Sequence, residues 1–184
     1  MSQRLVRLIW WPVLLMLSGC LGMPDGVKPV ENFDRQAYLG QWYEIARLDH
    51  SFERGLSHVT AEYSLRDDGG IRVINRGYDV DAQEWKSAEG RAYFTDEPQV
   101  AHLKVSFFGP FFSSYVVFGL DHENYQYAFV SGYNRNYLWL LARSPEVDDG
   151  VLSTFTEKAQ QLGFDTGQLI FPDHQPIPSS PKLD

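Results

Sequence analysis

Few side chains of this chain are suited to covalent or acid–base chemistry, since it contains one cysteine and five histidines. The cysteine closes the tetrad Leu17-Ser18-Gly19-Cys20, which follows an apolar run and a start that carries Arg4 and Arg7. A charged start, a short apolar stretch and a small-residue cleavage site are typical of an export signal. No Ser-His-acid order or metal-ligand spacing involves the histidines, which are His50, His58, His102, His122 and His174. The sequence therefore predicts no enzyme, no metal site and no cofactor, with haem binding through a loop histidine as the alternative.

The tetrad around Cys20 resembles the lipobox of bacterial lipoproteins. That resemblance implies that residues 1–19 are a signal peptide, that Cys20 is acylated and anchors the protein, and that residues 20–30 form a tether. Each buried acyl CH₂ contributes roughly 0.8 kcal/mol, so several chains hold a protein on a membrane. Leu21 stands where an aspartate commonly retains such proteins at the inner membrane, which implies the outer membrane and its periplasmic face. The alternatives are an ordinary signal peptide with a chance cysteine and a membrane-spanning helix, for which the apolar run is short.

The charge and the aromatic content narrow the class of partner. The formal net charge is −8 at pH 7, and removal of Arg4 and Arg7 with the signal peptide makes it more negative. This argues against nucleic acid and against a polybasic contact with anionic lipid. Aromatic residues make up 15% of the chain, which calls for either a dense core or an apolar ligand.

Most of the chain after residue 30 consists of segments in which apolar and polar residues alternate. These segments recur at the spacing expected for the strands of a sandwich or barrel. We expect strands at residues 41–49, 58–66, 71–79, 89–95, 101–108, 114–121, 125–132 and 137–144. An amphipathic pattern at 148–162 predicts one helix, and a last short strand is expected at 169–171. The predicted class is all-β, an eight-stranded antiparallel up-and-down β-barrel with one C-terminal α-helix packed outside, because closure removes exposed sheet edges. The domain spans residues 31–172, and a proline-rich tail spans 173–184.

Three motifs in this order resemble those of the lipocalin family. Gly40-Gln41-Trp42-Tyr43-Glu44 resembles the Gly-x-Trp signature, the run 120–125 resembles the second motif with a leucine in place of the usual threonine, and Arg143 matches the third. The runs 42–47, 63–70 and 103–110 are similar to those of bacterial outer-membrane lipocalins. The resemblance implies a protein that binds fatty acids or lysophospholipids in its barrel, for lipid storage or transport in outer-membrane maintenance. The alternatives are a structural or interaction protein with a filled barrel, and an enzyme acting on a lipid-like substrate.

Trp42 is expected to plug one end of the barrel beneath Arg143, with Gly40 beside them, as a pair that determines the fold. On the strands that contain Trp42 and Arg143, every second residue from these two is expected to point inward. On the other strands, the more apolar face is taken as the inner one. The predicted ligand-binding residues are Glu44, Ala46, Leu48, Ala61, Tyr63, Val73, Asn75, Ala92, Phe94, Leu103, Val105, Phe107, Val117, Ala128, Tyr137 and Trp139. Small residues leave space that aromatic ones enclose, although complete filling by the aromatics is the alternative. A buried Glu44 requires a proton or a hydrogen bond, which we expect from a tyrosine hydroxyl or a ligand headgroup.

The loops at the end opposite Trp42 are rich in aromatic residues. The up-and-down order places around the opening Phe52, Leu56, Trp85, Phe108, Phe111 and Phe112. Such a cluster usually marks an interaction surface, so it either folds over the entrance as a lid or touches the membrane or a second copy in a homodimer. In the same loops Arg54, Lys86 and Arg135 are candidates for an anionic headgroup.

Overall fold

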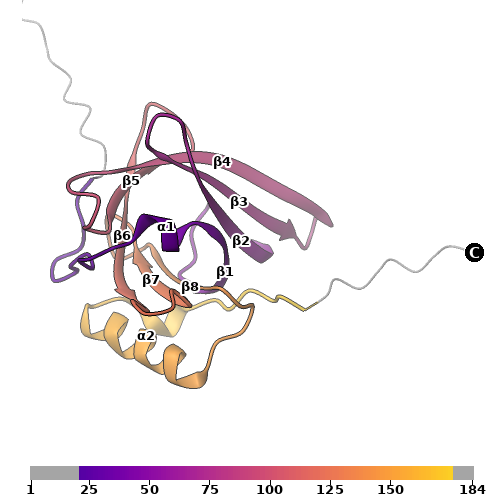
Figure 1. Cartoon of the computed structure of the whole chain (residues 1–184). Coiled ribbons are helices and arrows are strands. Elements are labelled where there is room, and N and C mark those ends of the chain that lie inside the picture. The colour runs from indigo at the N-terminus through magenta and orange to yellow at the C-terminus, as the bar shows by residue number, and fades with distance from the viewer. Residues whose placement is uncertain (1–20, 176–184) are drawn as a thin grey trace, which may run out of the picture.

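The computed structural model describes residues 21–175, which form a closed barrel of eight antiparallel strands with a helix against its outside (Figure 1). Each strand pairs with the next in the chain, and β8 pairs with β1. The strands are β1 (Gly40–Arg47), β2 (Leu56–Leu65), β3 (Ile71–Asp79), β4 (Glu84–Phe94), β5 (His102–Ser106), β6 (Ser113–Leu120), β7 (Tyr127–Ser131) and β8 (Leu138–Ala142). The predicted up-and-down barrel is confirmed. The predicted signal peptide, Cys20 and residues 176–184 of the predicted tail lie outside the described residues.

β4 begins at Glu84, well before the predicted start at residue 89. This first part of β4 is exposed on both faces, because it pairs with β3 alone while β5 pairs only with the stretch Arg91–Phe94. A strand without a buried face has no apolar alternation by which to recognise it. The β3–β4 hairpin therefore extends beyond the rest of the barrel wall.

Two short elements are absent from the prediction, and one predicted strand is wrong. The helix α1 (Arg35–Tyr38) is a single turn capped by Asp34, whose carboxylate accepts from two backbone amides, and η1 is a 3₁₀ turn at Thr166–Gln168. Such short elements show no helical periodicity in a sequence. The strand expected at residues 169–171 is reduced to one bridge between Ile170 and Arg47.

The helix α2 (Asp149–Gln161) is confirmed where the sequence predicts it, and it lies along the outside of the barrel. Its Phe155 is wholly buried and packs edge-on against Phe129 of β7, with ring centroids 5.2 Å apart. Lys158 donates a hydrogen bond of 2.7 Å to the carbonyl oxygen of Phe118 in β6. The outer faces of β6 and β7 thus form a second core with α2, separate from the cluster inside the barrel.

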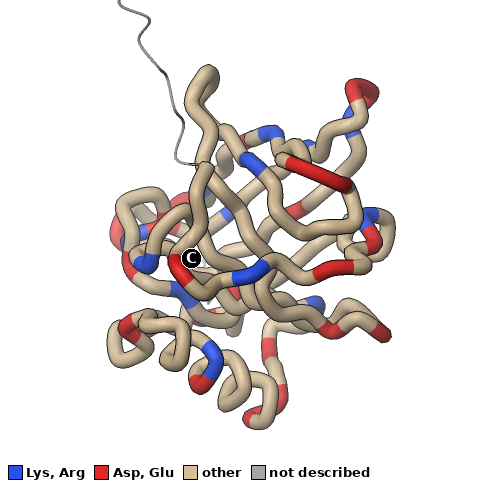
Figure 2. Tube along the Cα trace, turned by 90° about the vertical axis from the view of Figure 1, so that its left-hand side faces the viewer, with Lys and Arg blue, Asp and Glu red and all other residues tan. Residues whose placement is uncertain are grey.

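Residues of both charge signs are spread over the fold (Figure 2). The stretch from Val105 to Leu120 contains none. Among the exposed pairs on the outer wall are Arg72 with Glu89 at 2.6 Å and Arg76 with Glu62 at 2.9 Å. Exposed pairs of this kind contribute at most about 1 kcal/mol each. Within residues 21–175, no helix has the length and apolar character needed to cross a bilayer.

Candidate ligand site in the barrel interior

One end of the barrel is closed by Trp42. Its ring is wholly buried, its Nε1 donates to the carbonyl oxygen of Tyr38 at 2.8 Å, and the guanidinium carbon of Arg143 lies 4.0 Å from the ring centroid. Arg143 also donates to three backbone carbonyls in and beside α1. Gly40 has a φ of +94°, which residues with a side chain rarely adopt. The structure thus places the predicted closing residues in one connected group.

Three tyrosines lie next to this plug and form the floor of the interior. The hydroxyl of Tyr115 is 2.6 Å from that of Tyr38 and 2.9 Å from that of Tyr63. Burial raises the pKa of all three phenols, so they stay neutral and can only exchange hydrogen bonds. The floor is therefore polar but uncharged.

Cross-strand register puts most of the predicted interior residues on one face of the sheet. Trp42 lies opposite Ala61, and Ala61 lies opposite Asn75. Directly opposed residues point to the same side. The inner face so defined includes Glu44, Ala61, Tyr63, Val73, Asn75, Ala92, Phe94, Leu103, Val105, Phe107, Val117, Ala128 and Trp139.

Several inward side chains of this closed barrel are only partly buried. This group consists of Ala61, Phe94, Val105, Phe107 and Trp139. A filled core would bury them completely, because protein interiors pack to the density of crystals. Asn75 Oδ1 also points into this region and has no hydrogen-bond partner among the described residues. These inward apolar side chains are therefore less densely packed than those of a filled core, and one acceptor among them is unused.

The ring of Phe107 lies directly over Gly90, on the inner face of β4. A Cβ at Gly90 would come within 2.9 Å of two atoms of the Phe107 ring and 3.0 Å of the carbonyl oxygen of Ser106. A side chain at residue 90 would therefore clash with the ring of Phe107.

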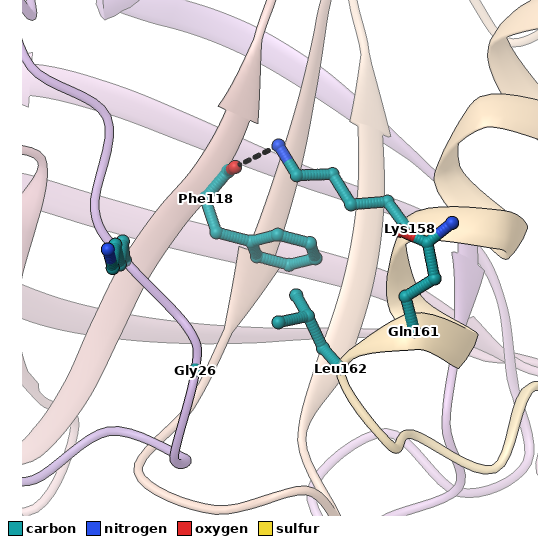
Figure 3. Close-up of a pocket in the computed structure, with 6 residues that line it drawn as sticks. Gly26, Phe118, Lys158, Gln161 and Leu162 are labelled. Atoms are coloured by element: carbon teal, nitrogen blue, oxygen red, sulfur yellow. Dashed lines mark hydrogen bonds between the residues drawn. The ribbon is translucent and has the colours of Figure 1, made fainter.

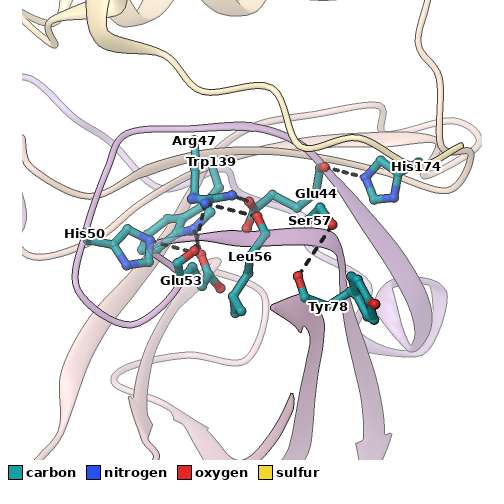
Figure 4. Close-up of polar contacts among 9 residues, drawn as sticks. All are labelled: Glu44, Arg47, His50, Glu53, Leu56, Ser57, Tyr78, Trp139 and His174. Carbon is teal, nitrogen blue, oxygen red and sulfur yellow. Dashed lines mark hydrogen bonds and ion pairs between the residues drawn. The ribbon is translucent and has the colours of Figure 1, made fainter. Parts of the chain in front are cut away.

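A buried polar cluster lies at the open end of the interior (Figure 4). Arg47 Nη1 is 2.6 Å from Glu44 Oε1, and Arg47 Nη2 donates to the carbonyl oxygen of Glu53 at 2.8 Å. The carboxylate of Glu53 accepts from Trp139 Nε1 at 3.1 Å and lies 3.0 Å from His50 Nε2. The partner of Glu44 is therefore an arginine and not the expected tyrosine or headgroup. Sequence reasoning missed Arg47, His50 and Glu53, because only the folded loop brings them together.

The pKa values of the two carboxyl groups in this cluster are shifted in opposite directions. Burial and the nearby charge of Glu53 raise the pKa of Glu44 well above its ordinary value, despite the proximity of Arg47. Burial also acts to raise the pKa of Glu53, but hydrogen bonds and charge from His50, Glu44 and Trp139 outweigh it and lower that pKa. Glu44 therefore holds a proton more strongly than Glu53 does, and the negative charge lies preferentially on Glu53.

We expect Glu44→Gln to change how stability depends on pH. Because the folded-state pKa of Glu44 is raised, its contribution is complete below the ordinary value of 4.5 and is lost as pH rises through the raised pKa. Glutamine resembles the protonated form. In that pH interval the free energy of unfolding of the variant should therefore rise, relative to that of the native protein, by up to about 1.4 kcal/mol per pH unit. Urea unfolding from pH 5 to pH 9 measures the difference. Parallel profiles for the native protein and the variant would contradict it, and Glu62→Gln on the outer wall is the control.

The assignment of Ala46 and Leu48 to the interior is wrong. The register between β1 and β8 shifts between Glu44 and Ala46, so that Ala46 lies opposite Leu140 and Arg47 opposite Trp139. Beyond this bulge the alternation of β1 is reversed. Ala46 and Leu48 pack into the outer core with α2, and Arg47 points inward in their place. Alternation carried from Trp42 along an uninterrupted strand takes no account of a bulge, which explains the error.

Two of the aromatic residues expected around the opening lie on the outer wall instead. Trp85 belongs to β4 and contacts the rings of Tyr78 and His58. Phe112 is half-buried beneath the charged groups of Arg91 and Lys104, at 5.6 and 5.5 Å. The other predicted rim residues remain at the open end, with exposed rings at Phe52, Phe108 and Phe111.

The cations expected to meet a headgroup are engaged within the protein. Arg54 pairs with Asp49 at 2.7 Å, and Lys86 pairs with Asp79. Arg135 donates to the carbonyl oxygens of Leu162 and Asp25.

Tyr137 precedes β8 at the opening, where its ring stacks against Trp139 with centroids 6.1 Å apart. Within residues 21–175, no three His, Cys, Asp or Glu side chains gather as a metal site would require.

A hollow of about 260 Å³ lies outside the barrel, between α2 and the N-terminal segment (Figure 3). Its lining includes Gly26, Phe118 and Leu162, and the aliphatic stem of Lys158 crosses it to reach the Phe118 carbonyl. Burial lowers the pKa of Lys158. Because this side chain links α2 to β6 by a hydrogen bond, the hollow is a packing gap in the outer core and is distinct from the barrel interior.

Comparisons with known proteins agree with this architecture. The family model of the lipocalin-like domain matches residues 33–174. Outer membrane lipoprotein Blc of Vibrio cholerae is 62% identical over 173 residues, covering 94% of this chain and 100% of that protein. Outer membrane lipoprotein Blc of Escherichia coli K12 is 55% identical over 148 residues, covering 80% and 83%. Insecticyanin from the tobacco hornworm Manduca sexta shares the fold, with a TM-score of 0.64 at 23% identity over 83% of this chain and 86% of that one.

Proposed function

This chain belongs to the lipocalin family as a bacterial outer-membrane lipoprotein, and we propose that its barrel holds the acyl chain of a fatty acid or a lysophospholipid. The proposed role is storage or transport of such lipids in maintenance of the outer membrane. The observation that carries the proposal is the set of inward, partly exposed apolar side chains, because an eight-stranded barrel has room for one small ligand.

The distribution of polar groups supports an amphipathic ligand that enters tail first. The floor near Tyr115 is uncharged, the apolar wall includes Val73, Ala92 and Val105, and the charges stand at the opening. Ligand sites of this kind are mainly apolar, with a few polar groups that fix orientation. Both Nη atoms of Arg47 and the carboxylate of Glu53 have partners within the cluster, so the headgroup is expected to lie at the opening and the tail below it.

We propose that Cys20 carries the acyl anchor that holds the protein at the outer membrane. Residue 20 lies outside the described residues, and the support comes from the tetrad that it closes and from the similar outer-membrane lipoproteins. The intact mass of the protein extracted from membranes checks this assignment. The family to which the chain belongs suggests binding without turnover, so bound lipid should be recovered unchanged.

Ala61→Trp distinguishes an open barrel from a filled one. Ala61 points inward and is partly exposed, so an indole at this position should occupy open space at little cost in stability. In a filled barrel the same change would overpack the core and lower the free energy of unfolding by about 1–3 kcal/mol. We expect a variant of native-like stability whose affinity for a fluorescent fatty acid falls at least about tenfold, since the indole takes the place of the chain.

Val105→Asp and Phe107→Asp test the same site through polarity. A carboxylate beside a buried hydrocarbon chain loses its hydration, so both variants should bind the fluorescent fatty acid at least about tenfold more weakly. Ser87→Asp is the matched control, because Ser87 is exposed and lies opposite Arg76 on the outer face. Unchanged affinity in both variants, with folding verified by circular dichroism, would place the ligand elsewhere. An empty barrel in native mass spectra of the extracted protein would favour a structural role.

A further inference from the structure

Asn75 is the middle residue of β3 and belongs to the inner face of the barrel. The strand begins at the closed end, where Arg35 of α1 donates a hydrogen bond to the turn that precedes it. It ends at Asp79, which lies opposite Leu56, and the carbonyl oxygen of Leu56 accepts from Arg47 in the cluster at the opening. Asn75 therefore lies about midway along the wall, between the plug and the charged cluster.

The amide of Asn75 has polar atoms that the surrounding wall does not satisfy. Its Oδ1 is buried and has no hydrogen-bond partner among the described residues. The residues opposite it on the two neighbouring strands are Ala61 and Ala88, and the next inward residue toward the closed end is Val73. None of these three side chains can donate or accept a hydrogen bond. Buried polar groups in proteins nearly always have a partner, so an unpaired amide at this place calls for an explanation.

The other polar groups that face the interior are engaged with one another. The hydroxyl of Tyr115 lies within hydrogen-bond distance of both other floor tyrosines, and the carboxylate of Glu53 accepts from Trp139. Among residues 21–175 the second buried side-chain oxygen without a partner is Ser106 Oγ, and Ser106 lies opposite Arg91 on the outer face. Asn75 is thus the polar group of the inner wall that is left for a ligand.

The place of the amide restricts the group that would pair with it. A charged group midway along this wall would leave water without a counter-ion, which is costly. An aliphatic hydroxyl group is neutral, and because it both donates and accepts it can pair with either end of an amide. The two ends of the amide exchange by rotation about one soft torsion, and Asn75 as a residue is only partly buried. Alanine at both opposing positions keeps the sides of the amide free of bulky groups.

We propose that Asn75 selects acyl chains that carry a hydroxyl group near the middle of the chain, as in a mid-chain hydroxy fatty acid. With the headgroup at the opening, the middle of a bound chain lies beside the middle of β3. An unsubstituted chain covers the amide and leaves it unpaired, whereas a hydroxylated chain satisfies it. This selection rests on the proposed lipid-binding function, and it adds the subclass of lipid that the barrel prefers.

The selection is tested by displacement of a fluorescent fatty acid with stearic acid and with 12-hydroxystearic acid. Asn75→Leu keeps a side chain of similar volume and removes its polar atoms. We expect the ratio of the dissociation constant of stearic acid to that of 12-hydroxystearic acid to fall at least about tenfold in this variant, because only the hydroxylated chain loses a partner. Both acids meet the same folded molecules, so a loss of stability does not alter the ratio. Asn124→Leu, in an exposed loop, is the control and should keep the native ratio.

The position of the hydroxyl group is tested with 2-hydroxystearic acid, whose hydroxyl lies beside the carboxyl group at the opening. Its affinity should respond to Asn75→Leu as that of stearic acid does. An unchanged ratio in Asn75→Leu would overturn the selection, since water would then serve the amide whichever chain is bound. Equal losses for the two hydroxylated acids would overturn it as well, because the effect would not depend on the middle of the chain. Failure of every acid to displace the probe from the native protein would refute the proposed function itself, and the selection with it.

Discussion

Arg47→Met is expected to lower the free energy of unfolding by about 3–5 kcal/mol, because it removes one partner of a buried ionic cluster. The arginine contacts the Glu44 carboxyl group at 2.6 Å and donates to the carbonyl oxygens of Glu53 and Leu56. Methionine fills similar volume but offers neither charge nor hydrogen bonds. The Glu44 carboxyl group then loses the cation beside it, and the loop between β1 and β2 loses the contacts that hold it over the interior.

Urea unfolding followed by circular dichroism at neutral pH measures this loss. Arg76→Met is the matched control, since Arg76 forms an exposed pair with Glu62 on the outer wall and should cost at most about 1 kcal/mol. Equal changes in the two variants would contradict the assignment of the cluster as buried and coupled. Because Arg47 lies at the opening, we also expect weaker lipid binding by the folded fraction of the Arg47→Met protein.

Trp42→Ala is expected to cost about 3–5 kcal/mol of stability, since it removes a wholly buried ring from the closed end. The indole packs against Tyr38 with ring centroids 4.7 Å apart, and the guanidinium carbon of Arg143 lies 4.0 Å from its centroid. Its loss leaves a cavity and also strands the carbonyl oxygen of Tyr38, which accepts from the indole nitrogen. The barrel end should therefore fray before the rest of the sheet, as hydrogen exchange of the β1 amides would reveal.

The comparison with Trp85→Ala isolates the effect of burial from that of residue type. Trp85 is 58% exposed on the outer wall, so its loss should change the free energy of unfolding by no more than about 1 kcal/mol. A double-mutant cycle of Trp42→Ala and Arg143→Ala should show a coupling of about 0.5–2 kcal/mol for the cation–π contact. Additive losses in that cycle would mean that Arg143 acts only through its backbone hydrogen bonds.

The fold could be predicted because its determinants are local in the sequence. Strands such as β3 and β5 alternate cleanly, α2 repeats its apolar residues with the period of a helix, and the residues 40–44 and Arg143 stand in a recognisable order. The strand boundaries fail at β4, where residues 84–89 have no buried face and so no pattern. The interior assignments hold wherever a strand runs without interruption, because alternation then transmits the direction of one known residue to the next.

The tertiary structure alone decided the chemistry of the opening. A bulge after Glu44 turned Ala46 and Leu48 outward and brought Arg47 inward, and the loop that follows folded His50 and Glu53 onto it. No one-dimensional pattern encodes a bulge or a contact between a loop and a strand, since both arise from which backbone groups of distant segments find one another. The sequence by itself determined that a barrel closes around Trp42. The packing of the closed barrel determined where its charges lie.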